Sequence, residues 1–383
     1  MKKIKYLILC LFFVFCSCNR QSDFDKALEY QDYGEYEEAI KYYVFSINKG
    51  EKVALAEKKL GDIFFSRQNY REAFNHYKKS LEVDAEVALD KVMQFISHSE
   101  LKVKNYAYLT LNDLKNKESK LRMFDYLSTV LKSKNQYKIL DVLELLPKLK
   151  NYISVSEALL DLLNTDNSMI KREVLPLLPN IAGMVVKRGY LDKIIALLNQ
   201  DNEVLKNLAI DCLGDMFSWA QKAYPDLVVV AVDPMYRKRV LRATEKIGVP
   251  TKEQVNEIFN YLKDKPEDLK IAIIEQIGNK RTEAKPFVPN FIAFLNDNSD
   301  DVKLAVRRSL SRIGKANKSC VPELIAMLQD DNEEIVARVI YELGDLGKDA
   351  GEAVDALKKI AENENTKKEL KDLAKTALQK IQE

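Results

Sequence analysis

The C-terminal part of this sequence repeats itself at one fixed interval. Residues 288–297 return as residues 321–330, and residues 269–273 return as residues 302–306. Within each copy, apolar residues recur every three or four positions, which is the spacing of an amphipathic helix. The stretch from the start of one copy to the start of the next is one repeat unit. Such a unit holds two helices whose apolar faces are buried only when neighbouring units stack on them. The period therefore predicts an all-α chain that folds as an α-solenoid, a superhelix of stacked antiparallel helix pairs.

Glycine and proline fall where such helix pairs need them. Gly314 and Gly347 are predicted to end the second helix of their units in the left-handed conformation that glycine adopts without strain. Pro289 and Pro322 fall in the first turn of a helix, where the missing N–H leaves no hydrogen bond unmade. The two members of each pair are separated by the repeat interval, so both pairs support the same register.

Three aspartates occupy one place in successive units, between the two helices. Asp264, Asp297 and Asp330 follow one another at the repeat interval. A carboxylate at a helix–helix turn can accept hydrogen bonds from backbone N–H groups. We therefore expect these residues to cap helices or brace loops rather than to act as acids or bases.

The same unit continues upstream with looser spacing. Residues 162–167 and 197–202 share Leu-Leu-Asn followed, after one residue, by Asp-Asn. Residues 225–233 look like a β-strand, but their spacing from Pro to Asp equals that of residues 322–330, which predicts a helix. This pattern resembles HEAT repeats, especially the short lyase-type variety, and covers residues 155–383.

A second, slightly longer period occupies the N-terminal part. The recurring residues are Tyr36, Ala39, Tyr43, Ser46 and Ile47, which return as Tyr70, Ala73, Tyr77, Ser80 and Leu81. This set resembles the tetratricopeptide repeat, and two such repeats are predicted in residues 19–87, with the tyrosines as core. The resemblance implies a peptide-binding groove along the inner helices. In the second repeat that face carries Lys58, Asp62, Phe65 and Ser66.

Two further segments complete the predicted organisation. Residues 88–154 have helical periodicity and are predicted to be divergent helical repeats. Residues 366–369, Thr-Lys-Lys-Glu, form a capping-box pattern at the start of the last helix. That helix has a lysine-rich face, which suits a polar C-terminal cap that stops further stacking.

The first 18 residues are predicted to be a lipoprotein signal peptide. Three lysines precede ten apolar residues at positions 6–15, and Cys16-Ser17-Cys18 follows. An apolar stretch this short does not span about 30 Å of hydrocarbon as a helix. Ser17-Cys18 resembles the lipobox of bacterial lipoproteins, which implies that Cys18 is lipidated and anchors the protein to a membrane.

This resemblance also implies a location. Asn19 is not the aspartate associated with inner-membrane retention, so we expect the outer membrane of a diderm bacterium, with the protein facing the periplasm. An ordinary secretory signal with an incidental cysteine is the alternative.

The charge balance argues against a nucleic-acid partner. Three of the 60 lysines and arginines fall in the signal peptide, and the other 57 face 58 acidic residues. Such a chain lacks the basic excess that neutralises phosphates. The one concentrated basic feature comprises Arg237, Lys238, Arg239 and Arg242. It predicts either a solvated helix face or a candidate surface for an acidic protein or an anionic polymer.

Sequence signatures of catalysis are missing. The chain has no GxxxxGK[ST] or GxGxxG loop, CxxC pair, HExxH helix or GxSxG elbow. His76 and His98 are expected to be surface or bracing residues, and Cys212 and Cys320 small buried hydrophobes. We therefore expect no catalytic residue, no metal and no cofactor.

Together these features predict a membrane-anchored, non-catalytic scaffold of the bacterial cell envelope that binds other envelope proteins or peptides. Stacked repeats offer extended surfaces for such partners. One alternative is a small-ligand carrier or sensor, which would contain a discrete deep pocket. The other is an enzyme similar to the bilin lyases, an activity that the resemblance to lyase-type HEAT units would imply.

Overall fold

A computed structural model describes residues 21–149, 152–313 and 318–383. The chain divides into two compact units, Met1–Val174 and Leu175–Glu383. Both are built from helices, and the described ranges contain no β-strand, which confirms the predicted all-α solenoid class. None of the described helices is long and apolar enough to cross a membrane. Cys18 and Gly314 lie outside the described residues.

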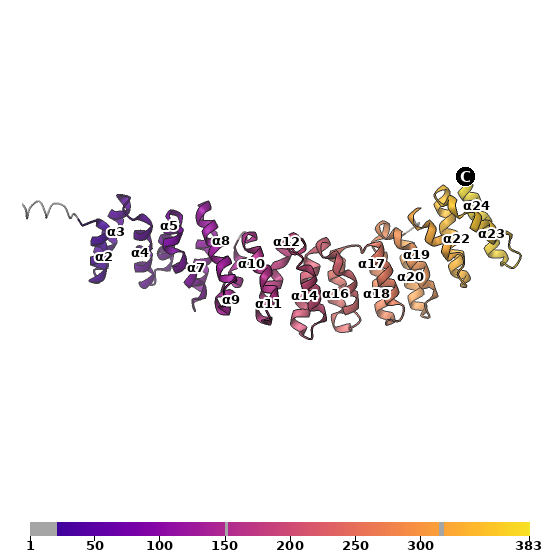
Figure 1. Cartoon of the computed structure of the whole chain (residues 1–383), viewed down its shortest axis with the longest axis horizontal. Coiled ribbons are helices and arrows are strands. Elements are labelled where there is room, and N and C mark those ends of the chain that lie inside the picture. The colour runs from indigo at the N-terminus through magenta and orange to yellow at the C-terminus, as the bar shows by residue number, and fades with distance from the viewer. Residues whose placement is uncertain (1–20, 150–151, 314–317) are drawn as a thin grey trace, which may run out of the picture. The chain divides into compact units, whose positions relative to one another are not determined.

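The first unit is a series of helices that begins with two pairs, α2 with α3 and α4 with α5 (Figure 1). Gly34 and Gln68, both with positive φ, form the tight turns within these pairs. The α-helices of this unit are α2 (Asp23–Asp32), α3 (Tyr36–Asn48), α4 (Val53–Ser66), α5 (Tyr70–Val83), α6 (Ala85–Gln94), α7 (Leu101–Asn112), α8 (Lys117–Leu131), α9 (Gln136–Leu145), α10 (Ser156–Asp161) and α11 (Ser168–Val174). Its short 3₁₀ segments are η1 (Phe95–Ser97), η2 (Leu146–Lys148), η3 (Ile153–Val155) and η4 (Leu162–Asn164).

Two of the four repeated tyrosines are core residues as predicted, whereas Tyr36 is 41% exposed and Tyr70 is only partly buried. Tyr43 and Tyr77 are fully buried. Tyr43 donates its hydroxyl to Gln31 Oε1 at 2.6 Å, and Tyr77 donates to Asp62 Oδ1 at 2.8 Å. The Tyr77 ring lies against Gly61, where an added Cβ would be 2.6 Å from a ring carbon. Each buried tyrosine therefore fills the space between helices while its polar end is satisfied.

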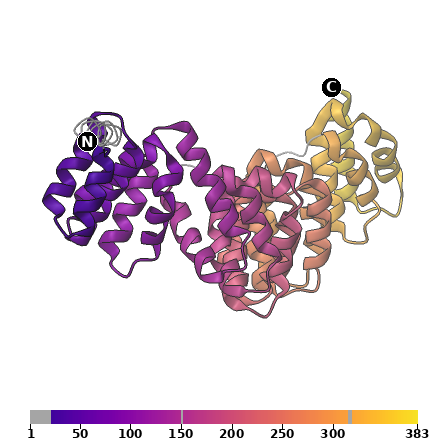
Figure 2. The same ribbon diagram turned by 60° about the vertical axis from the view of Figure 1, so that its left-hand side comes forward.

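The second unit repeats one pattern of a shorter helix followed by a longer one. We call the longer helices B helices: α14 (Glu203–Asp215), α16 (Pro234–Ile247), α18 (Glu267–Gly278), α20 (Asp300–Ile313), α22 (Glu333–Leu346) and α24 (Lys368–Gln382). The shorter A helices are α13 (Leu191–Ala196), α15 (Tyr224–Val230), α17 (Lys252–Leu262), α19 (Val288–Ala293), α21 (Val321–Met327) and α23 (Val354–Glu362), and α12 (Ala182–Lys187) precedes them. Figure 1 shows the helices of this unit following one another in chain order, and in Figure 2 the yellow C-terminal helices lie at one end of the unit.

The predicted register is confirmed at several points of the second unit. Residues 225–230, β-like by composition, belong to helix α15. Pro289 and Pro322 occupy the first turns of α19 and α21. Gly347 follows α22 with φ 59°, in the left-handed region.

Two of the three repeated aspartates brace loops, and the residues two positions after them cap the next helices. Asp297 accepts the Ser299 N–H at 3.0 Å, and Asp330 accepts the Asn332 N–H at 2.8 Å. Asn332 is the residue that caps α22. Asp264 differs from the other two because its side chain is 79% exposed and pairs only with adjacent Lys265 among the described residues.

The predicted capping box at residues 366–369 is wrong. Helix α24 begins at Lys368, and its N-cap, Lys367, makes no side-chain capping bond. The Thr366 N–H instead donates to the Asn363 carbonyl at 3.1 Å. Thr366 therefore lies one residue before the N-cap position, and its hydroxyl does not cap the helix. The apolar face of α24 is nevertheless buried through Ala374, Ala377 and Ile381.

Candidate functional site

The predicted face of the second N-terminal repeat lies on α4. Asp62 accepts the Tyr77 hydroxyl and lies 3.8 Å from Lys58 Nζ, one helical turn away. Lys91 Nζ of α6 lies 3.9 Å from the same carboxylate. Burial beside Asp62 raises the pKa of Tyr77 far above its usual range, so the phenol stays protonated. The structure thus brings Lys58 and Asp62 together, with Asp62 also serving the core.

The other two residues of this face have different surroundings. Phe65 stacks on Phe95 with ring centroids 4.4 Å apart and contacts Tyr70 at 5.2 Å. Most of its ring therefore packs within an aromatic cluster, and it is only partly exposed. Ser66 is exposed and donates its hydroxyl to the Ile63 carbonyl at 2.8 Å.

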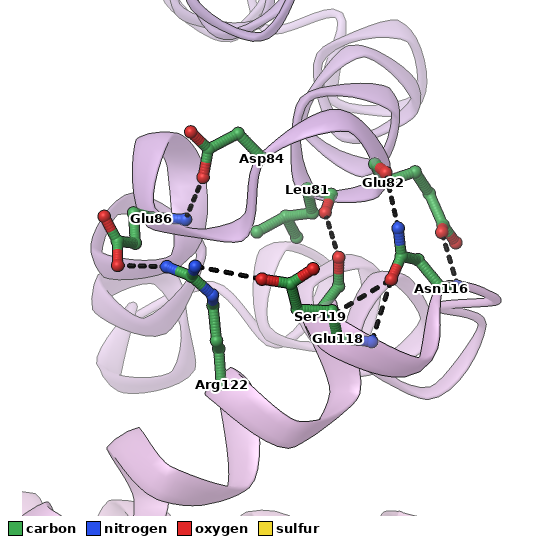
Figure 3. Close-up of polar contacts among 8 residues, drawn as sticks. All are labelled: Leu81, Glu82, Asp84, Glu86, Asn116, Glu118, Ser119 and Arg122. Atoms are coloured by element: carbon green, nitrogen blue, oxygen red, sulfur yellow. Dashed lines mark hydrogen bonds and ion pairs between the residues drawn. The ribbon is translucent and has the colours of Figure 1, made fainter.

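A dense polar cluster further along the first unit is a brace between helices (Figure 3). Glu82 at the end of α5 accepts the Asn116 N–H at 2.6 Å, just before α8 begins. Ser119 of α8 donates to the Leu81 carbonyl at 2.5 Å. Arg122 lies between Glu86 and Glu118 and pairs with both. These contacts hold α8 against α5 and α6.

One small pocket opens among α6, η1, α8 and α9. It has a volume of about 190 Å³, and its lining residues include Met93, Ile96, Tyr126, Val130 and Asp141. Pockets for small molecules typically measure about 300–1,000 Å³. This pocket is therefore below the size that a small-ligand carrier would need.

The basic cluster predicted from the sequence lies on α16, and half of it is neutralised. Arg237 donates to the carbonyls of Ala231 and Val232 and forms an ion pair with Asp268 of α18. Arg239 forms an ion pair with Asp211 of α14. These two arginines tie α16 to the B helices on either side of it.

Lys238 and Arg242 behave differently. Both are exposed and neither forms an ion pair with any described residue. They line a groove of about 720 Å³ together with Leu241 and Glu245 of α16 and with residues of α18. From α18 the groove receives Ala272, Glu275, Gln276, Asn279 and Lys280. This groove is large enough to hold part of another molecule.

The histidines and cysteines brace or fill the fold, as predicted. His76 Nδ1 lies 2.6 Å from Glu57 Oε2, and the His76 ring stacks on Phe64. His98 Nδ1 accepts the Glu100 N–H at 3.1 Å. Cys212 and Cys320 are both buried, and burial raises the pKa of the Cys212 thiol. Within the described ranges, no three His, Cys, Asp or Glu residues are arranged to hold a metal ion.

A comparison with models of protein families gives a match in the C-terminal part of the chain. Residues 288–379 match the family model of HEAT repeats. No curated protein matches the sequence. An engineered protein of solved structure is 16% identical, with a TM-score of 0.38, and the match covers 85% of this chain and 99% of that one.

Importin beta is a second solved structure in the comparison. It is 11% identical with a TM-score of 0.42, and the match covers 94% of this chain and 55% of the importin beta chain. The helix pairs of the described residues and the family match show that the chain is an all-α solenoid with HEAT-like repeats in its C-terminal part.

Proposed function

We propose that the protein is a membrane-anchored, non-catalytic scaffold of the bacterial cell envelope that binds envelope proteins or peptides on its helix faces. The observation that carries this proposal is the groove along α16 and α18, whose charged residues Lys238 and Arg242 are not used by the fold. Other charged side chains on α16 make contacts between repeats, for example Arg237 and Arg239. Repeat proteins use such surfaces to bind other proteins.

The proposed membrane anchor is a lipid on Cys18. The support is the lipobox-like Ser17-Cys18 after a short apolar stretch, and attachment of several acyl chains would hold the protein stably at a membrane. With Asn19 after the cysteine, we place the protein at the outer membrane, facing the periplasm.

The N-terminal helix pairs are proposed to provide a second binding surface. Residues 19–87 are interpreted as two tetratricopeptide-type repeats, and the exposed parts of Lys58, Phe65 and Ser66 on α4 would contact a peptide there. Asp62 would act mainly by orienting Lys58, because its carboxylate also accepts the buried Tyr77 hydroxyl. Neither the small-ligand carrier nor the lyase-like enzyme gains support from the small pocket among α6, α8 and α9.

The test is mass spectrometry of the protein extracted from membranes of its native cells after mild crosslinking. We expect an acylated N-terminal peptide that begins at Cys18, together with crosslinks to envelope proteins. The Cys18→Ser variant should leave the membrane fraction, whereas the matched Cys16→Ser variant should stay in it. An unmodified N-terminus with cytosolic neighbours would overturn the proposal.

A further inference from the structure

At one position of the repeat, glycine alternates with other residues along the B helices of the second unit. In each B helix this position follows the residue just before the helix by the same number of residues. Gly214 follows Asn202 in this way, and Gly344 follows Asn332. We call it the contact position. The residues there, from α14 to α22, are Gly214, Glu245, Gly278, Ser311 and Gly344. Glycine thus occupies the contact position in every second B helix.

Each of these glycines marks a close approach to the next B helix. A Cβ added to Gly214 would lie 2.8 Å from Ala243 Cα of α16. One added to Gly278 would lie 2.5 Å from Ser309 Cβ of α20. At Gly344 the distance to Ala377 Cα of α24 would be 3.0 Å. The pairs α14–α16, α18–α20 and α22–α24 are therefore packed backbone to backbone, because only glycine fits there.

The joint between α16 and α18 is built differently. Glu245 occupies the contact position of α16. On α18, Gln276 occupies the repeat position that Ala243 has on α16 and Ser309 has on α20. The long Gln276 side chain bridges the joint by donating to the Leu241 carbonyl at 2.8 Å and to Thr244 Oγ1 at 3.0 Å. The groove of about 720 Å³ lies along this joint, and Gln276 is part of its lining. The exchange of glycine for glutamate thus places a groove between two tightly packed helix pairs.

The groove carries four charges that the fold leaves unpaired. Lys238, Arg242, Glu245 and Glu275 line it, and none of them forms an ion pair with a described residue. The repeat register puts Glu275 level with Arg242. Lys238 lies one turn nearer the N-terminal ends of the two helices, and Glu245 lies about one turn nearer their C-terminal ends. Lys280 lines the same end as Glu245, where its ammonium group donates to the Glu245 carbonyl at 3.4 Å.

The distribution of these charges makes the groove polar along its length. The end near Lys238 is basic, and Arg242 and Glu275 lie level with each other in the middle. The other end carries Glu245, beside which Lys280 donates to a backbone carbonyl. A chain laid along the groove would therefore meet positive charge first and negative charge about two helical turns later.

We propose that this groove binds an extended segment of a partner protein that carries an acidic and a basic side chain about three residues apart. The acidic side chain would meet Lys238 at one end and the basic one would meet Glu245 at the other, with Arg242 and Glu275 level with each other between them. Seven residues of helix separate Lys238 from Glu245, a rise of roughly 10 Å, which about three residues of extended chain span. This inference rests on the proposed scaffold function and specifies which partner segments it would recognise.

The probe is a displayed library of random octapeptides, selected on the full chain in detergent. We expect selected peptides to share an acidic and a basic residue two to four positions apart. In fluorescence anisotropy, the Lys238→Glu, Arg242→Glu double variant should bind these peptides about tenfold more weakly or worse, since attraction for the acidic side chain becomes repulsion. Lys358→Glu, a charge reversal at an exposed lysine of α23, is the matched control and should bind as the wild type does.

Two results would overturn the groove proposal. One is a selection without the acid–base pattern, and the other is undiminished binding by a double variant that circular dichroism shows to be folded. Crosslinks to envelope proteins in cells separate this failure from failure of the scaffold. If the double variant keeps every crosslink, the scaffold stands and the groove is not its binding site. If the wild type makes no envelope crosslinks but selects the expected peptides, the groove stands and the scaffold in the envelope does not.

Discussion

At the scale of single residues, the contact position of the B helices gives the sharpest stability prediction. Gly278→Ala would place a Cβ 2.5 Å from both Cβ and Oγ of Ser309. Overpacking of this kind costs about 1–3 kcal/mol, which outweighs the gain of up to about 1 kcal/mol from the better helix propensity of alanine. We expect a lower urea midpoint, measured by circular dichroism.

The matched control is Gly351→Ala. A Cβ at Gly351 meets no atom within 4 Å, so this variant should be as stable as the wild type or slightly more so. Equal stability of the two variants would show that α18 and α20 do not approach each other as closely as described.

A buried ion pair makes a second prediction at this scale. Lys270 Nζ lies 2.7 Å from Asp297 Oδ2, and the two side chains are only 11% and 8% exposed. Lys270→Met would leave the carboxylate buried with a backbone partner alone, a change that typically costs about 3–5 kcal/mol. Thermal unfolding should show the loss, and the double variant Lys270→Met, Asp297→Leu should recover part of it.

An exposed ion pair of the same type serves as the comparison. Lys222 and Asp192 are 66% and 64% exposed, so Lys222→Met should cost less than about 1 kcal/mol. A similar loss in both lysine variants would contradict the claim that burial, and not pairing, sets the cost.

At the scale of helices, we expect α15 to depend on the packing of its repeat and not on its own sequence. Its residues 227–230 are Leu followed by three valines, and β-branched residues favour strands. We expect a synthetic peptide of residues 221–235 to show little helix in water by circular dichroism. A peptide of residues 368–382, which form α24 and are rich in Lys, Leu and Ala, should be measurably more helical. Equal helicity would mean that α15 forms without its neighbours.

A second prediction at this scale concerns acid. Lys252 at the start of α17 donates to Glu323 of α21 at 2.5 Å, and this hydrogen bond lowers the pKa of the Glu323 carboxyl. Because the folded pKa is below the unfolded one, the stabilisation is present above the unfolded value of about 4.3 and is lost as pH falls through the folded pKa. Both side chains are partly exposed, so the effect stays below about 1 kcal/mol. The Glu323→Gln variant should lose less stability than the wild type between pH 7 and pH 3.

How far the sequence predicts these elements depends on the range of the interactions involved. The helix at α15 and the first-turn positions of Pro289 and Pro322 follow from the repeat register, because the same pattern recurs in several units. The capping box at residues 366–369 failed because a local turn at Asn363 competes with it.

The basic cluster on α16 shows the opposite case. Arg237 and Arg239 are neutralised by aspartates of the neighbouring helices α18 and α14. Those partners come from other repeats, so composition alone could not separate these arginines from Lys238 and Arg242. Only the packing of α16 between its neighbours identifies which charges remain exposed.

At the scale of the whole molecule, we propose that a helical-repeat fold is combined with a membrane anchor and with exposed surfaces for partners. The alternation of Gly214, Glu245 and Gly278 was visible in the sequence once the register was set. Its consequence was not, because a groove depends on distances between helices. The repeats therefore fix where helices lie, and the exception at Glu245 marks the groove in which we propose that a partner binds.

The most direct test of this account is site-specific photocrosslinking in the native cells. A photoreactive amino acid at Leu241, in the groove, should yield discrete crosslinked proteins in the membrane fraction, and the Lys238→Glu, Arg242→Glu double variant should lose them. The same amino acid at Lys358 of α23 should not yield these products. If Leu241 gives no products, or gives the same products as Lys358, the claim that this protein is a scaffold acting through the α16–α18 groove is contradicted.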